Sequence, residues 1–228
     1  QRYEYGYRDV RDSPLIYSFS GQPYVDVRAS INSFIPSEIS EALSKKLVNA
    51  YLDILINNPE YHDKLEFNVV FTVWAPTFMA EAKKRFEKYN ISDAELKELE
   101  SKLKILTINS LNRLDSDIES LKKLSHGRSN IINGDHYIID KIFYLISDCK
   151  KYGTLAFSHA ARSGFVAKSF LNSFVDLNIL SKDKMNDLLS SIKTVMTDYT
   201  HDKKLLSQNK ITKRQFIDEY GHLRPGTY

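Results

Sequence analysis

Hydrophobic positions along most of the chain repeat every three or four residues, which is the period of an amphipathic helix. One such stripe follows Pro36 and ends at the stop signal Asn57-Asn58-Pro59, with Ser37 as the expected N-cap. A second series begins at Ser92 and predicts either one long helix or two helices packed back to back. A polar stretch over 126–134 predicts a loop. Further helices are expected over 135–151, 154–178 and 181–206. The stripe residues are Ile39, Leu43, Leu47, Tyr51 and Ile54 in the first helix, and Leu96, Leu99, Leu103, Leu106, Leu114, Ile118, Leu121 and Leu124 in the second series.

Two segments depart from this helical period. Residues 15–20 and 24–30 are rich in β-branched and aromatic side chains and flank Gly21-Gln22-Pro23, which predicts a hairpin. Residues 67–74 are apolar at nearly every position and predict a strand buried on both faces that joins the hairpin. The expected fold class is mainly α with a small β-sheet near the N-terminus (α+β), in a single domain spanning 1–228.

Alternation in the second hairpin strand places Tyr24, Asp26, Arg28 and Ser30 on one side, followed by Asn32. One interpretation is an exposed sheet face with a weak Asp26–Arg28 ion pair. The other is a site that binds an amino acid, with the guanidinium on the α-carboxylate and the carboxylate on the α-ammonium group. Spacing alone favours neither interpretation.

Two further groups of polar residues fall on or beside predicted helices. Ser158 and Arg162 stand four residues apart and share a helix face. Since an unpaired buried charge is costly, Arg162 is expected to reach either a bound anion or a carboxylate of a neighbouring helix. The last helix has a capping box at Thr212 and Gln215 and a predicted left-handed C-cap at Gly221. His222 and Arg224 then follow in a loop; a domain terminus can equally be a plain exit segment.

The amino-acid composition excludes several classes of fold and of binding site. The 228 residues are 42% hydrophobic and 27% charged, which is enough to form a core. Eight glycines and six prolines are too few for a turn-rich β-sandwich. Cys149 is the only cysteine, which excludes an intramolecular disulfide and a cysteine-built zinc site and suits a reducing, cytoplasmic compartment. The spacing of the six histidines predicts no metal site, and no glycine-rich phosphate loop is present.

Partners are constrained by charge and hydropathy. The net charge is +3, with acids and bases interspersed, so nucleic-acid binding is not expected. No run approaches about 18 consecutive apolar residues, and no membrane span is predicted. The chain starts at Gln1 without an apolar signal segment, and we expect it to be a piece of a longer protein.

Three blocks of the sequence are GQPYVDVRASINSFIP at 21–36, NPEYHDKLEF at 58–67 and YGHLRPGTY at 220–228. Together they resemble a branch of the phosphoenolpyruvate synthase-like phosphotransferases. Within this family the chain is similar to the L-glutamine kinases of bacterial capsular polysaccharide phosphoramidate synthesis. The resemblance implies a central acceptor-binding domain, inactive alone, between an ATP-grasp domain and a swivelling phosphohistidine domain. It also implies no cofactor in this domain, with ATP and Mg²⁺ bound elsewhere in the full-length enzyme.

The resemblance further implies a reaction and roles for residues. ATP phosphorylates the mobile histidine, which then phosphorylates the side-chain amide of L-glutamine, with AMP and phosphate as the other products. The acceptor would be bound by Tyr24, Asp26, Arg28, Ser30, Ser158 and Arg162, with Arg28 and Arg162 on the carboxylate and phosphoryl oxygens. Asp26 or Glu66 would take the ammonium or a proton, and His222 and Arg224 would close over the phosphoryl group.

Ser158-His159 echoes the phosphohistidine motif of such enzymes, but Leu155-Ala156-Phe157 stands where that motif has paired glycines. A phosphoryl carrier also needs an exposed histidine, whereas His159 falls inside a predicted amphipathic helix. Two alternatives to the glutamine hypothesis stay open. One is a related phosphotransferase domain for another acceptor, such as an antibiotic hydroxyl or pyruvate. The other is a non-enzymatic helical module that contacts a protein or RNA.

Overall fold

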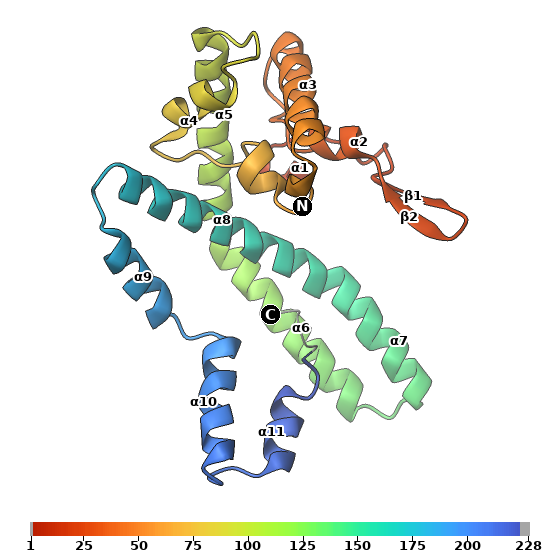
Figure 1. Cartoon of the computed structure of the whole chain (residues 1–228). Helices are drawn as coiled ribbons and strands as arrows, with labels where there is room; N and C mark the ends of the chain where they lie inside the picture. Colours follow the sequence, from red (N-terminus) through yellow and green to blue (C-terminus); the bar gives the residue numbers. More distant parts are fainter. Residues whose placement is uncertain (1, 224–228) are drawn as a thin grey trace. The chain divides into compact units, whose positions relative to one another are not determined.

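The computed structural model describes residues 2–223, without the side chain of Ser120 (Figure 1). The chain folds as two compact units, Gln1–Leu177 and Asn178–Tyr228. The expected class is confirmed, because helices dominate and a two-stranded antiparallel sheet lies near the N-terminus. That the whole chain acts as one acceptor-binding module stays a prediction.

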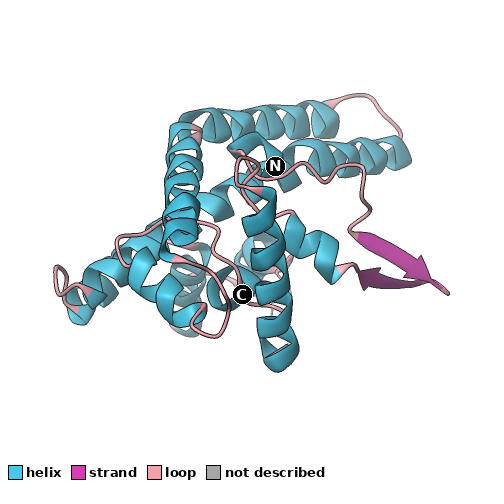
Figure 2. Cartoon of the chain, turned by 90° about the horizontal axis from the view of Figure 1, so that it is seen from above, coloured by secondary structure: helices cyan, strands magenta, loops and turns pink. Residues whose placement is uncertain are grey.

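The hairpin consists of β1 (Ile16–Phe19) and β2 (Gln22–Val25), with Ile16 opposite Val25 and Phe19 opposite Gln22. Its turn is formed by Ser20 and Gly21, whose φ angles of 51° and 78° fit the two-residue turns that match strand twist. Figures 1 and 2 show the hairpin projecting from the helices, and all of its side chains are exposed. The predicted hairpin is therefore present, but its second strand is shorter than expected.

The expectation of a strand over 24–30 is wrong beyond Val25, because α2 (Val27–Asn32) begins there. The side chain of Asp26 accepts a hydrogen bond from the Ala29 amide at 2.8 Å and caps this helix. Ile31, on the inner face of α2, is fully buried in the core. A buried apolar anchor and an N-cap favour the helix over continued strand pairing.

The core lies among α1 (Arg2–Tyr5), α2, α3 (Glu41–Asn57), α4 (Phe78–Arg85) and α5 (Asp93–Asn112). The N-cap of α3 is Ser40, which accepts from the Leu43 amide, so the expectation that Ser37 caps this helix is wrong. The stripes predicted on the first helix and on the start of the second series face this core. Its fully buried large side chains are Tyr5, Tyr7, Ile31, Ile35, Leu43, Leu47, Tyr51, Val69, Val70, Leu99 and Leu103.

The expected strand over 67–74 is wrong, although its burial is partly confirmed. A short 3₁₀ helix, η1 (Pro59–Tyr61), and a π-helix, η2 (Leu65–Val69), precede an irregular segment in which Val70 is buried. Side chains from helices replace a neighbouring strand as hydrogen-bond partners: the Phe71 amide donates to Tyr51 Oη at 3.3 Å, and the Trp74 amide donates to Thr107 Oγ1 at 2.8 Å. Buried backbone N–H and C=O groups need hydrogen-bond partners, and side chains can supply them as well as a neighbouring strand.

The long series that begins at Ser92 divides into α5 and α6 (Leu114–Asn133) at Arg113. The expected loop over 126–134 is wrong, since α6 runs to Asn133. Figure 1 shows α6 beside a long rod made of α7 (Ile138–Asp148), the π-helix η3 (Cys149–Gly153) and α8 (Thr154–Asp176). Packing against this rod overrides the weak helix propensity of the serine, asparagine and glycine residues in α6.

The second unit contains α9 (Lys182–Ser191), α10 (Val195–Ser207) and α11 (Lys213–Tyr220). One helix over 181–206 is therefore wrong, because a capping box at Thr194 starts α10 anew. The capping box of Thr212 and Gln215 is confirmed. Gly221 has φ −64°, so the expected left-handed C-cap is wrong.

Candidate functional site

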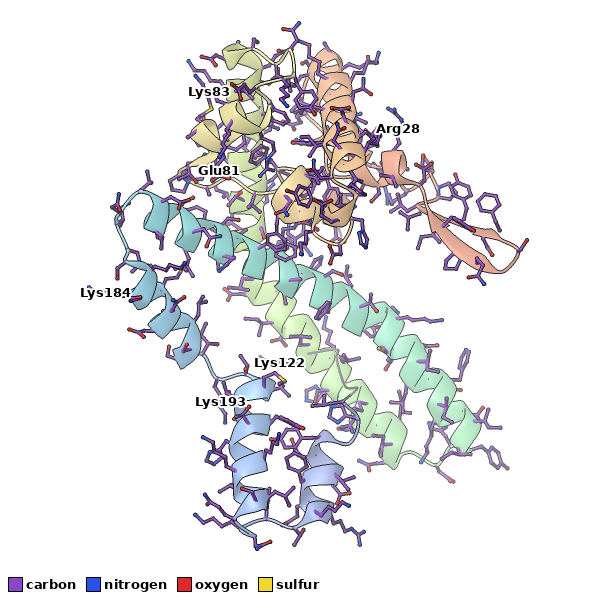
Figure 3. The ribbon with its side chains drawn as sticks, viewed as in Figure 1. Arg28, Glu81, Lys83, Lys122, Lys184 and Lys193 are labelled. Carbon is purple, nitrogen blue, oxygen red and sulfur yellow. The ribbon has the colours of Figure 1, made fainter. Side chains whose placement is uncertain are left out.

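A cavity of about 450 Å³ lies between α2 and α3, and we call it the α2–α3 cavity. Figure 3 labels Arg28 beside these two helices. Asp26, as N-cap, and Arg28, in the first turn, reach the same cavity because α2 begins between them. The lining residues are Arg8, Asp26, Arg28, Ala29, Asn32, Ser44, Lys45, Val48 and Asn49.

The two arginines of this cavity are held by neutral side chains. Arg28 Nη1 donates to Asn49 Oδ1 at 3.2 Å, and Arg8 Nη1 donates to Asn32 Oδ1 at 3.0 Å. Asp26 uses one carboxylate oxygen to cap α2, which leaves the other for a further donor. Since an amide neutralises no charge, both guanidinium groups keep their positive charge for a guest.

The balance of charge in the α2–α3 cavity is positive. Arg8, Arg28 and Lys45 line it together with the single carboxylate of Asp26, and Lys45 is paired with Glu41 at 2.8 Å on the surface. One carboxylate and two forked guanidinium groups can bind an ammonium and at least one oxyanion together. The arrangement therefore suits a zwitterion or a small anion, and no catalytic base is evident in it.

A second group of charges is buried between η2 and α8. Arg162 Nη1 lies 2.6 Å from Glu66 Oε2, and their side chains are 4% and 19% exposed. The guanidinium also lies 5.5 Å from the ring centre of Tyr7 and 5.7 Å from that of Phe165. Of the two partners considered for Arg162, the structure shows the carboxylate of a neighbouring segment. Glu66 is thereby held as the counter-charge of Arg162.

Arg2 and Tyr7 lie near this ion pair. Burial lowers the pKa of Arg2, and the charge of Glu66 opposes that shift. Burial raises the pKa of Tyr7 to about 12, so its phenol stays neutral at physiological pH. The Tyr7 hydroxyl donates to the carbonyl oxygen of Thr72.

His159 is 3% exposed and is held by two carboxylates. Its Nδ1 lies 2.8 Å from Asp117 Oδ1, and its Nε2 lies 3.2 Å from Glu4 Oε2. Arg113 reaches the same acids, at 3.0 Å from Glu4 and 3.5 Å from Asp117. A histidine enclosed in this way cannot present its ring to another domain, which argues against a carrier role for it.

The remaining predicted site residues are dispersed. Tyr24 is 54% exposed on β2 and packs against Phe19. Ser30 lies on α2 but lines other cavities than Arg28 does. The Ser158 hydroxyl donates to the Thr154 carbonyl oxygen within α8. His222 lies in an exposed turn of the second unit, and Arg224 lies outside the described residues.

Sequence reasoning missed Arg8 and Arg2. Both flank a segment in which tyrosine recurs at every second position, Tyr3-Glu4-Tyr5-Gly6-Tyr7, and Tyr5 and Tyr7 are fully buried. The alternation itself is misleading, because Tyr3 lies on the helix α1 and is exposed, so the density of aromatic residues was the available signal that this segment belongs to the core. The position of Arg8 is fixed by an isolated β-bridge between Tyr7 and Pro36, and no local sequence pattern predicts that bridge.

Comparison with known proteins adds no relative: no family model, no curated protein and no solved structure matches this chain. Within residues 2–223, no group of three or more histidine, cysteine or acidic side chains is placed to hold a metal ion. Over the same residues, no helix combines the length and apolar character that crossing a bilayer requires.

Proposed function

We propose that this chain is the acceptor-binding domain of a phosphoenolpyruvate synthase-like phosphotransferase whose acceptor is L-glutamine. The observation that carries the proposal is the α2–α3 cavity, in which Asp26, Arg28 and Arg8 combine opposed charges. Asp26 and Arg28 also lie within the block 21–36 on which the family resemblance rests. The proposal does not depend on Ser158 or Tyr24.

The roles follow from the charges. Arg28 and Arg8 bind the α-carboxylate of the amino acid through their paired N–H groups. The free oxygen of Asp26 accepts from the α-ammonium group. The excess positive charge attracts the phosphoryl group of a phosphohistidine domain. As phosphorus bonds to the side-chain amide nitrogen, its bond to the histidine nitrogen breaks, and the displaced imidazole takes up the proton that the amide loses. An amide nitrogen is a poor nucleophile, so positioning it in line with phosphorus is the main task of this domain.

Arg162 and Glu66 take a different role from the one that the family resemblance implied. A guanidinium already paired at 2.6 Å with a carboxylate has little charge left for a substrate. We assign this pair to the stability of the fold around the site. ATP and Mg²⁺ belong to other domains of the full-length enzyme in this proposal.

The test is calorimetric titration of the 228-residue chain with L-glutamine, and separately with L-asparagine and pyruvate. L-Glutamine is expected to bind, and Arg28→Gln and Asp26→Asn should each weaken its affinity at least tenfold. Asp26→Asn is chosen because asparagine also caps helices, so the variant removes charge and keeps α2. Arg214→Gln, at an exposed position of the second unit, is the matched control and should leave the affinity unchanged.

Three results would count against the proposal. Absence of binding by L-glutamine removes the acceptor assignment, and preferential binding of pyruvate moves the chain to another branch of the family. Equal affinity in the wild type and in both cavity variants removes the α2–α3 cavity as the site. Circular dichroism of each variant separates loss of binding from loss of folding.

A further inference from the structure

A second cavity, of about 230 Å³, is lined by α1, α2, α8, η2 and the segment before η2, and we call it the Arg2 cavity. It shares no lining residue with the α2–α3 cavity. Drug-sized ligands usually occupy pockets of about 300–1,000 Å³, so this cavity fits a smaller guest. Its lining residues are Arg2, Ser30, Phe34, His62, Asp63, Lys64, Leu65, Glu66, Phe67 and Phe165.

Positive charge exceeds negative charge around the Arg2 cavity. Arg2 and Lys64 line it together with Asp63 and Glu66, and the excess comes from Arg162, which lies outside the lining and is paired with Glu66 at 2.6 Å. Glu66 is paired with Arg162 and also lies near enough to Arg2 to oppose the lowering of its pKa, so one carboxylate is shared by two guanidinium groups. Within residues 2–223, no carboxylate lies at ion-pair distance from Arg2. Two partly buried guanidinium groups that share one carboxylate leave positive charge uncompensated, and a bound anion would compensate it.

Arg2 is also held in a fixed orientation. Its guanidinium carbon lies 3.5 Å from the ring centre of Phe34, and Nη1 donates to Ser33 Oγ. A guanidinium has five N–H donors, and the bond to Ser33 uses one of them. The remaining donors keep a constant geometry on the aromatic face, which reduces the entropy lost when an oxyanion binds.

We propose that the Arg2 cavity binds a phosphate-class oxyanion. Arg2 supplies the forked donors, Lys64 adds a second positive charge, and Ser30 contributes a hydroxyl to the wall. The shared ligand chemistry is a phosphoryl group, which arrives either as free inorganic phosphate or on an imidazole ring. The proposal needs only this cavity, so it stands whether or not the α2–α3 cavity binds L-glutamine.

The experiment is isothermal titration of the 228-residue chain with inorganic phosphate and, in a second arm, with N-phosphoimidazole, at constant ionic strength against chloride. Binding in at least one arm is expected. Arg2→Gln should weaken that binding at least tenfold, and Lys64→Gln at least threefold. Tighter binding of N-phosphoimidazole assigns the cavity to a phosphoryl group carried on imidazole, and tighter binding of phosphate assigns it to the free ion.

Two controls make the outcome specific. Lys88→Gln and Lys97→Gln change exposed lysines of the same unit outside both cavities, and both should leave phosphate affinity unchanged. Arg28→Gln reports phosphate that binds in the α2–α3 cavity instead. Lys64 is exposed, so Lys64→Gln tests the proposal even if Arg2→Gln fails to fold. The proposal is overturned if neither phosphate compound binds, or if Arg28→Gln weakens binding while Lys64→Gln does not.

Discussion

Arg28 and Arg162 lie in the same unit, yet their surroundings give them opposite uses. Arg28 is exposed at the α2–α3 cavity and donates to a neutral amide, Asn49. Arg162 is buried between aromatic rings and is paired with Glu66. The first charge is available to a guest, and the second is already committed to the fold.

The difference shows that residue type alone does not identify a binding arginine. A guanidinium exposed to water is stable without a partner, whereas a fully buried guanidinium without a counter-charge is costly. Burial therefore separates the two arginines that the family resemblance had grouped in one site. Four predictions test this separation.

Removing the counter-charge of the buried arginine should have the largest effect. Glu66→Gln leaves Arg162 charged and buried, so the free energy of unfolding should fall by about 3 kcal/mol or more. Arg28→Gln should change it by less than about 0.5 kcal/mol. Urea denaturation measures both. The double variant Glu66→Gln with Arg162→Met should recover most of the lost stability. Equal losses in Glu66→Gln and Arg28→Gln would show that the buried and the exposed arginine do not differ in this way.

The second-largest effect is expected from alkaline pH, which should destabilise the core around Tyr7 and Tyr51. Burial raises the pKa of Tyr7 and of Tyr51 to about 12, above about 10 in the unfolded chain. Because the folded pKa is the higher one, this contribution is complete below pH 10 and is lost as pH rises to about 12. A shift of two units corresponds to about 3 kcal/mol for each tyrosine.

Thermal or urea unfolding between pH 9 and pH 12 measures how steeply the free energy of unfolding falls with pH. Tyr7→Phe and Tyr51→Phe should each flatten this slope, since phenylalanine has no proton to lose. An unchanged slope in both variants would show that other groups govern the alkaline transition.

His159→Ala should have an intermediate effect. The substitution removes the imidazole that bridges Asp117 and Glu4, and a loss of about 2 kcal/mol is expected. His126→Ala, at an exposed position on α6, should stay within about 0.5 kcal/mol of the wild type. A similar small change at both positions would mean that the His159 network contributes nothing net.

The smallest effect on stability is expected at Asp26, the N-cap of α2 in the α2–α3 cavity. Asp26→Ala removes the bond to the Ala29 amide and should cost about 1 kcal/mol, whereas Asp26→Asn should cost a few tenths. Chemical denaturation of the two variants separates capping from charge. If Asp26→Asn is as destabilising as Asp26→Ala, the carboxylate has a structural role beyond the cap.

Prediction from the sequence succeeded for helices whose regular hydrophobic stripe packs against a single core. The stripe on α3 and the leucines of α5 are buried as their spacing indicates, and the hairpin lies where β-branched and aromatic residues gather. It failed where two local signals compete. Asp26 fits both a strand and a helix cap, and residues 67–74 are apolar enough for a strand but find side-chain partners instead.

The sequence by itself determined the fold class, the helices α3 and α5 and the last capping box, because these depend on residues a few positions apart. Only the tertiary structure decided which charges meet. Arg162 and Glu66 are almost one hundred positions apart, and Arg8 reaches Asn32 through the packing of the chain around Pro36. Such contacts follow from how helices pack in space, and no pattern along the chain encodes that distance.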